Sequence, residues 1–105
     1  MLSNKSASGT SFHDKVWTAT YNDMVKAIGE PQYTGIDKSN YMWVCELPKE
    51  DVLQGSEVFT VYDWKYYRPL RNDEVVEWHI GSHDAYTSML AIDYLMDAFS
   101  SLLKK

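Results

Sequence analysis

The sequence has few of the features that disulfide-bonded proteins, membrane proteins or nucleotide hydrolases need. It contains one cysteine, no glycine-rich phosphate-binding loop and no apolar run long enough to cross a bilayer. The single Cys45 has no partner for an internal disulfide, and in its apolar, alternating segment a thiol usually behaves as a small buried hydrophobe. The polar start also lacks the apolar region of a signal peptide. These absences predict an intracellular, cytoplasmic protein with no membrane partner.

Positive charge is also scarce. Ten basic side chains stand against fifteen acidic ones, which gives a net charge of −5. A negative surface repels a phosphate backbone, so nucleic acid is not an expected partner. The same surface suits a basic site on another protein.

Apolar residues are plentiful by comparison. Hydrophobic residues make up 45% of the chain and aromatic residues 14%, which is too much apolar surface for a disordered protein. The length of 105 residues fits one core. Small polar residues dominate residues 1–11, which predicts a flexible N-terminal arm. Residues 12–105 are expected to form one α+β domain.

The best-defined local element is a short helix that begins after Thr20. Thr20 and Asp23 form a variant of the capping box, and apolar side chains then recur at three-four spacing. Gly29 can adopt the left-handed conformation that ends a helix, and Pro31 cannot continue one. The start and the end of this helix are therefore both predicted.

Three segments rich in aromatic and β-branched residues predict strands at 41–47, 57–64 and 74–80. Sequential strands of this kind usually pair as antiparallel neighbours. The last segment alternates, so Trp78 and His79 belong to opposite faces. The predicted fold is an antiparallel three-stranded meander with an N-terminal helix and a long C-terminal helix.

The C-terminal helix is unusually apolar. Ser82 or Asp84 can cap it, and its periodic pattern continues to about Leu103. Its apolar side chains form two stripes: Ala85, Met89, Ile92, Met96, Phe99 and Leu103 in one, and Ala91, Leu95, Ala98 and Leu102 in the other. This arc is too wide for simple docking on one sheet. Either the sheet curls around the helix or a second copy covers part of it, and we expect a homo-oligomer formed through this helix.

The stretch 78–84 passes from a strand through Gly81 into a helix start. Amides at a helix N-terminus, with His79 and His83 beside them, could hold a phosphate or a carboxylate. In the alternative interpretation Gly81 makes the turn, Ser82 caps the helix, and both histidines are partly buried spacers. The histidines also have the spacing of an HxxxH zinc pair, but Gly81 interrupts the continuous helix that such a pair needs, so no metal is predicted.

A second suggestive stretch, 62–69, places two cations among aromatic residues. Rings such as Tyr66 beside Lys65 and Arg68 can stack on a base and pair with a phosphate or carboxylate. Cross-strand packing explains the same pattern equally well. Our candidate ligand-binding site joins both stretches and consists of Lys65, Tyr66, Arg68, His79, Gly81, Ser82 and His83. In a meander these groups fall at different strand ends, so the site needs offset strands or a neighbouring subunit.

Catalytic patterns are absent from the sequence. No nucleophile lies beside a base in a known frame, and the acidic residues are scattered. The sequence therefore predicts a protein that is not an enzyme and has no cofactor.

Several short motifs resemble those of small proteins encoded by tailed bacteriophages. The resemblance runs through residues 9–13, 28–31, 62–65 and 78–81 and covers about residues 9–85. It implies a context and no particular activity or functional residue. Small acidic phage proteins commonly act by binding, either blocking a host protein or sequestering a host signalling molecule.

Three hypotheses about function follow from these observations. The first is a non-catalytic, phage-encoded inhibitor that neutralises a host defence factor by binding a host protein. The second is a sponge that sequesters a small anionic or nucleotide signalling molecule at the candidate site. The third is a structural or virion accessory subunit, which the wide apolar arc of the last helix would explain.

Overall fold

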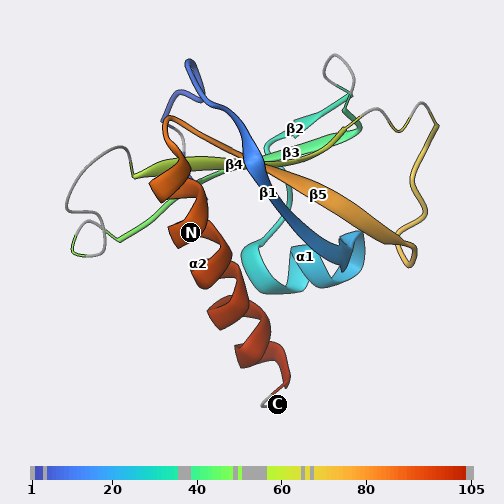
Figure 1. Ribbon diagram of the computed structural model, residues 1–105. Coiled ribbons are helices and arrows are strands. Elements are labelled where there is room, and N and C mark those ends of the chain that lie inside the picture. Colours follow the sequence, from blue (N-terminus) through green and yellow to red (C-terminus); the bar gives the residue numbers. More distant parts are fainter. Residues whose placement is uncertain are drawn as a thin grey trace.

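The computed structural model describes residues 2–3, 5–35, 39–48, 50, 57–64, 66 and 68–103. Within them the chain order is β1 (Ser11–Thr20), α1 (Tyr21–Ile28), β2 (Tyr33–Thr34), β3 (Tyr41–Glu46), β4 (Val58–Asp63), β5 (Val75–Ser82) and α2 (Ala85–Leu103). The strands form one antiparallel sheet in the order β1-β5-β4-β3-β2. Figure 1 shows both helices on the same side of this sheet. The α+β class is thus confirmed.

The central part of the sheet matches the sequence analysis. β3 pairs with β4 and β4 pairs with β5, both antiparallel, which is the predicted meander. The sheet nevertheless has five strands in the described residues, so the prediction of three understates it by two. The additional strands lie at the two edges, beside β5 and β3.

The local sequence explains why β1 and β2 are not predicted as strands. β1 carries a bulge, because its register against β5 shifts between Phe12 and Val16. Asp14 lies in this bulge with a positive φ of 64°, a conformation that Asp tolerates better than most residues. The bulge breaks the alternation of apolar residues, and β2 has only two residues. Neither pattern predicts a strand without knowledge of its neighbours.

The helix boundaries follow from the caps that the sequence predicts. The Thr20 side chain accepts a hydrogen bond of 3.1 Å from the amide of Asp23. Gly29 ends α1 with φ 97° and donates its N–H to the carbonyl of Val25 at 2.9 Å. At the second helix Asp84 is the cap, since its carboxylate accepts 2.7 Å from the amide of Thr87.

Two tryptophans connect the sheet to α1. Trp43 and Trp78 are fully buried and meet edge to face, with ring centroids 5.1 Å apart. The Trp43 indole donates to the carbonyl of Gly29 at 2.8 Å, and the Trp78 indole donates to that of Ala19 at 3.0 Å. The first bond joins β3 to the C-terminal end of α1, and the second joins β5 to β1 just before α1 begins. These bonds fix the helix against the core.

α2 covers the same side of the sheet with its second stripe. Ala91 and Leu95 are fully buried, while Met89 and Met96 on the first stripe are 48% and 51% exposed. Phe99 on the first stripe packs edge to face against Trp17. The second stripe of α2 is therefore packed in the core, while Met89 and Met96 of the first stripe remain at the surface.

The segment that was expected to be an arm contacts the sheet. Leu2 forms a β-bridge with Cys45, and the amide of buried Ser3 donates to the carbonyl of Val44 at 2.8 Å. Lys5 forms ion pairs with Glu46 and Glu57.

The same segment then crosses the sheet. It starts beside β3, and β1 begins at Ser11 on the far side of β5. On the side of the sheet that faces away from the helices, Val44, Val58 and Thr60 are buried.

Candidate binding face

One face of the sheet carries neither of the two helices in the described residues, and a row of side chains crosses it. The register pairs Tyr33 with Met42, Met42 with Tyr62, Tyr62 with His79, and His79 with Val16. Directly paired residues point to the same face, so these five form a continuous row across all five strands. We call this the aromatic row. At about 4.8 Å per strand it is roughly 19 Å long.

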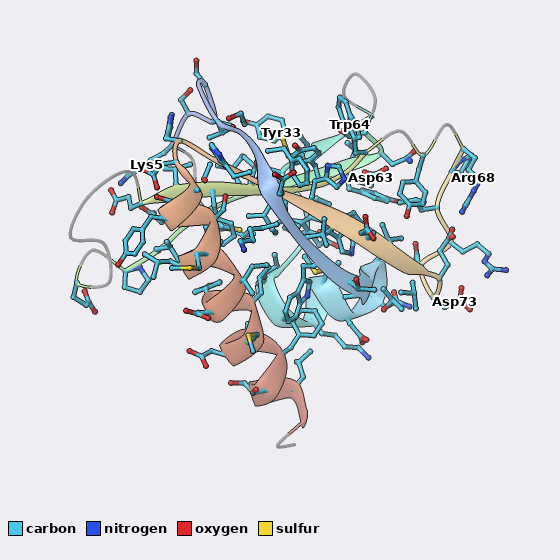
Figure 2. The ribbon with its side chains drawn as sticks, viewed as in Figure 1. Lys5, Tyr33, Asp63, Trp64, Arg68 and Asp73 are labelled. Carbon is cyan, nitrogen blue, oxygen red and sulfur yellow. The ribbon has the colours of Figure 1, made fainter. Side chains whose placement is uncertain are left out.

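The aromatic row is a surface feature. Tyr33 is 44% exposed and Val16 38%, and the neighbouring Phe12 and Trp64 are 39% and 38% exposed. Figure 2 shows Tyr33 and Trp64 on the side of the sheet away from both helices. Four of the large exposed hydrophobic side chains therefore gather on one face. Gathering of this kind is typical of an interaction site, whereas single exposed apolar residues are ordinary.

His79 lies at the centre of this face. Its ring stacks on Phe12 with centroids 4.2 Å apart and on Trp64 at 6.4 Å, and it meets Tyr62 edge on at 5.7 Å. Desolvation among these rings lowers the pKa of His79, although nearby Glu77 acts in the opposite direction. The imidazole is therefore uncharged at neutral pH and serves as an additional flat ring.

A cavity of about 230 Å³ opens beside the row. Tyr62, Trp64 and Met42 supply its apolar walls. Its other described lining residues are Thr10, Ser11, Ser39, Thr60 and Gly81. None of these side chains carries a charge at neutral pH, and burial raises the pKa of the Tyr62 hydroxyl further. The cavity thus combines ring faces with hydroxyl groups.

Gly81 allows the two central strands to meet closely below the cavity. A Cβ atom at this position would lie 2.5 Å from Oγ1 of Thr60, its cross-strand partner, and 3.4 Å from the Tyr62 ring. The glycine is required by packing within the sheet. It does not open a helix start toward a ligand, which is the role that the sequence predicts for it.

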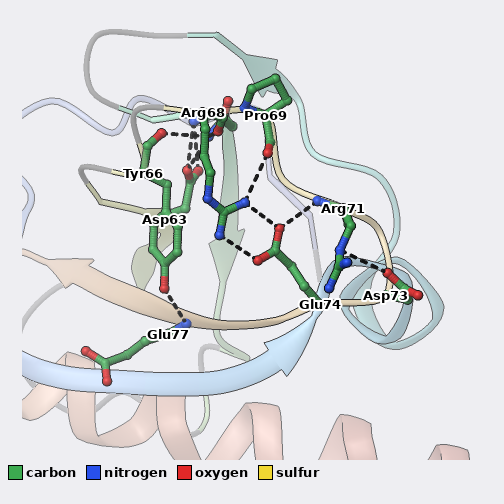
Figure 3. Close-up of polar contacts among 9 residues, drawn as sticks. Asp63, Tyr66, Arg68, Pro69, Arg71, Asp73, Glu74 and Glu77 are labelled. Carbon is green, nitrogen blue, oxygen red and sulfur yellow. Dashed lines mark hydrogen bonds and ion pairs between the residues drawn. The ribbon is translucent and has the colours of Figure 1, made fainter.

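Arg68 is already engaged within the chain. Its guanidinium forms two hydrogen bonds of 2.7 Å to the carboxylate of Glu74, as Figure 3 shows, and it lies 5.7 Å from the Tyr66 ring centroid. The Arg68 bond and the Arg71 amide lower the pKa of Glu74 to about 2. An anionic ligand would have to displace a bidentate pair that is charged at all physiological pH values.

Tyr66 has a structural contact as well. Its hydroxyl accepts a hydrogen bond of 3.4 Å from the amide of Glu77. Lys65, the remaining member of the predicted cationic stretch, lies outside the described residues.

A buried carboxylate holds this loop in place. Asp63 is fully buried and accepts hydrogen bonds from the amides of Asn40 and Tyr41, both at 2.8 Å, and from the Asn40 side chain at 2.9 Å. The same Asn40 amide group donates to the carbonyls of Tyr66 and Arg68 at 3.2 and 3.1 Å. Asp63 thus supports the start of β3 and, through Asn40, the loop after β4.

The Gly81 turn also differs from the anion cradle that its sequence suggests. The Ser82 hydroxyl is buried, donates to the Asp84 carbonyl at 2.5 Å and shares a 2.6 Å hydrogen bond with Ser88. The Ser82 carbonyl lies 3.2 Å from the His13 ring, and His83 is exposed. Because the carboxylate of Asp84 occupies the helix start, this end of α2 disfavours a second anion.

The two halves of the predicted joint site are separated. Arg68 binds Glu74 just before β5 begins, whereas Gly81 and His83 lie at or beyond its other end. Val75 and Gly81 are six residues apart, which is roughly 20 Å along a strand. A single chain does not bring these groups together. Of the seven predicted residues, His79 and Gly81 belong to the face described above.

The sequence missed most of the binding face. Phe12, Val16 and Tyr33 lie on strands that were not predicted, and Met42 was read only as part of a strand. The available signal was the odd-even alternation within β3 and β4, which places Met42, Tyr62 and Trp64 together.

The described residues show little that supports catalysis. Cys45 is fully buried, as predicted, and desolvation raises the pKa of its thiol to about 12, which makes it a poor nucleophile. Among the described residues no group of three or more His, Cys, Asp or Glu side chains is arranged to hold a metal ion.

Comparison with protein-family models, with curated proteins and with solved structures found no match for this chain. In the part of the chain that the structure describes, neither helix is both long and apolar enough to span a membrane. The geometry of the open face is therefore the basis for the function proposed below.

Proposed function

We propose that this protein is a non-catalytic binding protein that recognises a partner protein through the open face of its sheet. The observation that carries the proposal is the aromatic row, which crosses all five described strands and leaves Tyr33 and Val16 exposed, with exposed Trp64 beside it. Aromatic side chains supply most of the binding energy at many protein interfaces. The resemblance to phage proteins adds a context, in which the partner is a host factor and the bound complex neutralises it.

A rigid sheet is a good support for such a contact. The row residues belong to paired strands, so their side chains are held in place before the partner arrives and lose little conformational entropy on binding. The opposite side of the sheet is covered by α1 and α2.

Capture from a host lysate with matched variants tests this proposal. The first variant, Phe12→Ala with Trp64→Ala, removes apolar surface from the open face. The control, Met89→Ala with Met96→Ala, removes exposed apolar side chains from α2. We expect a defined partner protein to be retained by the wild type and the α2 variant and lost by the face variant. Calorimetry with the purified partner then confirms a direct contact.

Two outcomes would contradict the proposal. Equal capture by the face variant would mean that the open face is not the contact. Loss with only the α2 variant would favour the structural-subunit hypothesis, in which the exposed methionines mediate assembly. Small molecules released from the captured protein should also be identified, because an anionic nucleotide among them would support the sponge hypothesis.

A further inference from the structure

We propose that the cavity beside Trp64 accepts one aromatic side chain from a positively charged segment of the partner protein. This inference rests on the proposed function, since it names the part of the partner that enters the open face. It specifies three things that can be measured separately: the size of the group that enters, its aromatic character, and the charge of the residues beside it.

The size of the cavity limits what can enter. Its volume of about 230 Å³ is below the roughly 300–1,000 Å³ of pockets that enclose a whole drug-sized ligand. One ring with its adjoining carbon fits, and the rest of the ligand must lie on the open face outside. A side chain anchored in a small pocket at the centre of an interface is the arrangement that alanine scanning repeatedly finds at binding hot spots.

The lining of the cavity favours an uncharged aromatic group. Trp64 and Tyr62 offer ring faces and edges, and the thioether of Met42 makes favourable contacts with rings. Hydroxyl groups among the lining residues, such as those of Ser11 and Ser39, can bond a phenol. A charged side chain would lose its hydration there without finding an opposite charge among the described lining residues.

Charges around the open face favour a basic segment. Arg68 is neutralised by Glu74, and Lys5 faces two carboxylates. The lowered pKa of His79 keeps that ring neutral, while Glu77 on the same face is exposed. In β1 the exposed Asp14 and Lys15 have opposite charges, so Glu77 and the net charge of −5 of the whole chain are what favour a positively charged segment. Lysine or arginine beside the anchor side chain is attracted, whereas the phosphate of a nucleotide is repelled.

The methionines of this protein provide a built-in probe. Met42 lines the cavity, Met24 is buried in the core, and Met89 and Met96 are exposed on α2. In protein labelled with ¹³C at the methionine methyl groups, each site gives its own resonance, which Met42→Leu assigns. Binding in the cavity moves the Met42 resonance and leaves the two α2 resonances as controls for non-specific apolar contact.

Four small probes separate the three requirements. They are the capped tripeptides Lys-Tyr-Lys, Lys-Ala-Lys and Glu-Tyr-Glu, and adenosine monophosphate. We expect Lys-Tyr-Lys to shift Met42 with saturation and Lys-Ala-Lys to leave it unchanged. Glu-Tyr-Glu should bind at least about threefold more weakly at low salt, a difference that shrinks at high salt because surface charges are screened.

Variants test whether the signal comes from the cavity. Trp64→Ala removes an exposed wall and should weaken Lys-Tyr-Lys at least about tenfold, as loss of a hot-spot side chain does. Tyr62→Phe keeps the ring and should bind within about twofold of the wild type. If Trp64→Ala does not fold, the wild-type titrations with the four probes still decide the question.

Three results would overturn the inference. Saturable binding of adenosine monophosphate at Met42 that is tighter than that of Lys-Tyr-Lys would make the ligand a nucleotide. Equal shifts at Met42, Met89 and Met96 would show non-specific contact. No shift at Met42 with any tripeptide, combined with loss of the partner by the face variant, would reject the anchor pocket and leave the proposed function standing. Saturable binding of Lys-Tyr-Lys without any captured partner would support the anchor pocket and reject the proposed function.

Discussion

Replacing Asp63 should unfold the edge of the sheet that supports the open face. Its carboxylate is fully buried and accepts three donor groups, namely the amides of Asn40 and Tyr41 and the side-chain amide of Asn40. Asp63→Ala leaves these donors without an acceptor at the start of β3. It also frees the side-chain amide of Asn40, which donates to the carbonyls of Tyr66 and Arg68.

The size of the effect follows from the number of bonds. A hydrogen bond to a charged group contributes about 1.5–3 kcal/mol, and Asn40 is only partly buried, so water can replace some of the loss. Three bonds at the low end of this range give about 4.5 kcal/mol for Asp63→Ala. Asp63→Asn keeps one acceptor oxygen for the two backbone amides but turns an NH₂ group toward Asn40, and we expect a loss of about 2 kcal/mol.

Urea unfolding followed by far-UV circular dichroism measures both losses, and hydrogen exchange at the amides of Asn40 and Tyr41 reports the local effect. Asp73→Ala is the matched control, because its side chain is 82% exposed and lies 3.8 Å from Arg71; it should change the unfolding free energy by less than about 0.5 kcal/mol. A loss below about 1 kcal/mol for Asp63→Ala, or unchanged exchange at both amides, would refute the reasoning.

Three further predictions concern the core and α2. The pKa of Cys45 is raised from about 9 to about 12, so the folded state loses up to about 4 kcal/mol as pH rises above 9. Cys45→Ala should flatten that alkaline decline in urea unfolding, and an unchanged slope would contradict it. Gly81→Ala should lower the free energy of unfolding by about 1–3 kcal/mol, because its Cβ would overlap the Thr60 side chain. In a double-mutant cycle Thr60→Ala should recover at least half of this loss, and simple additivity of the two changes would contradict the contact. If α2 mediates self-association, Met96→Glu at the exposed stripe should dissociate the oligomer in sedimentation experiments, while Leu95→Glu in the core should unfold the chain. A monomeric wild type would exclude self-association through α2.

Local chemistry made part of the fold predictable. Thr20 and Gly29 delimit α1 because a cap is a contact between residues close in sequence. The alternation in β4 and β5 assigned Trp78 to the core and His79 to the other face, since side chains of a strand point to opposite sides in turn. The predicted burial of Cys45 followed from its place in the apolar segment that forms β3, where a thiol behaves as a small hydrophobe.

Tertiary structure decided the binding face. Tyr33, Met42, Tyr62, His79 and Val16 come from five separate strands, and only the register of the sheet makes them neighbours.

Tertiary structure also decided which charges are available. Arg68 reads as a free cation in the sequence, yet the fold brings Glu74 against it. The sequence by itself determined the two helices and the three central strands and which side of each is apolar, because those depend on nearest neighbours along the chain. The positions of the rings and the pairing of the charges depend on contacts across strands, which arise only when the sheet assembles.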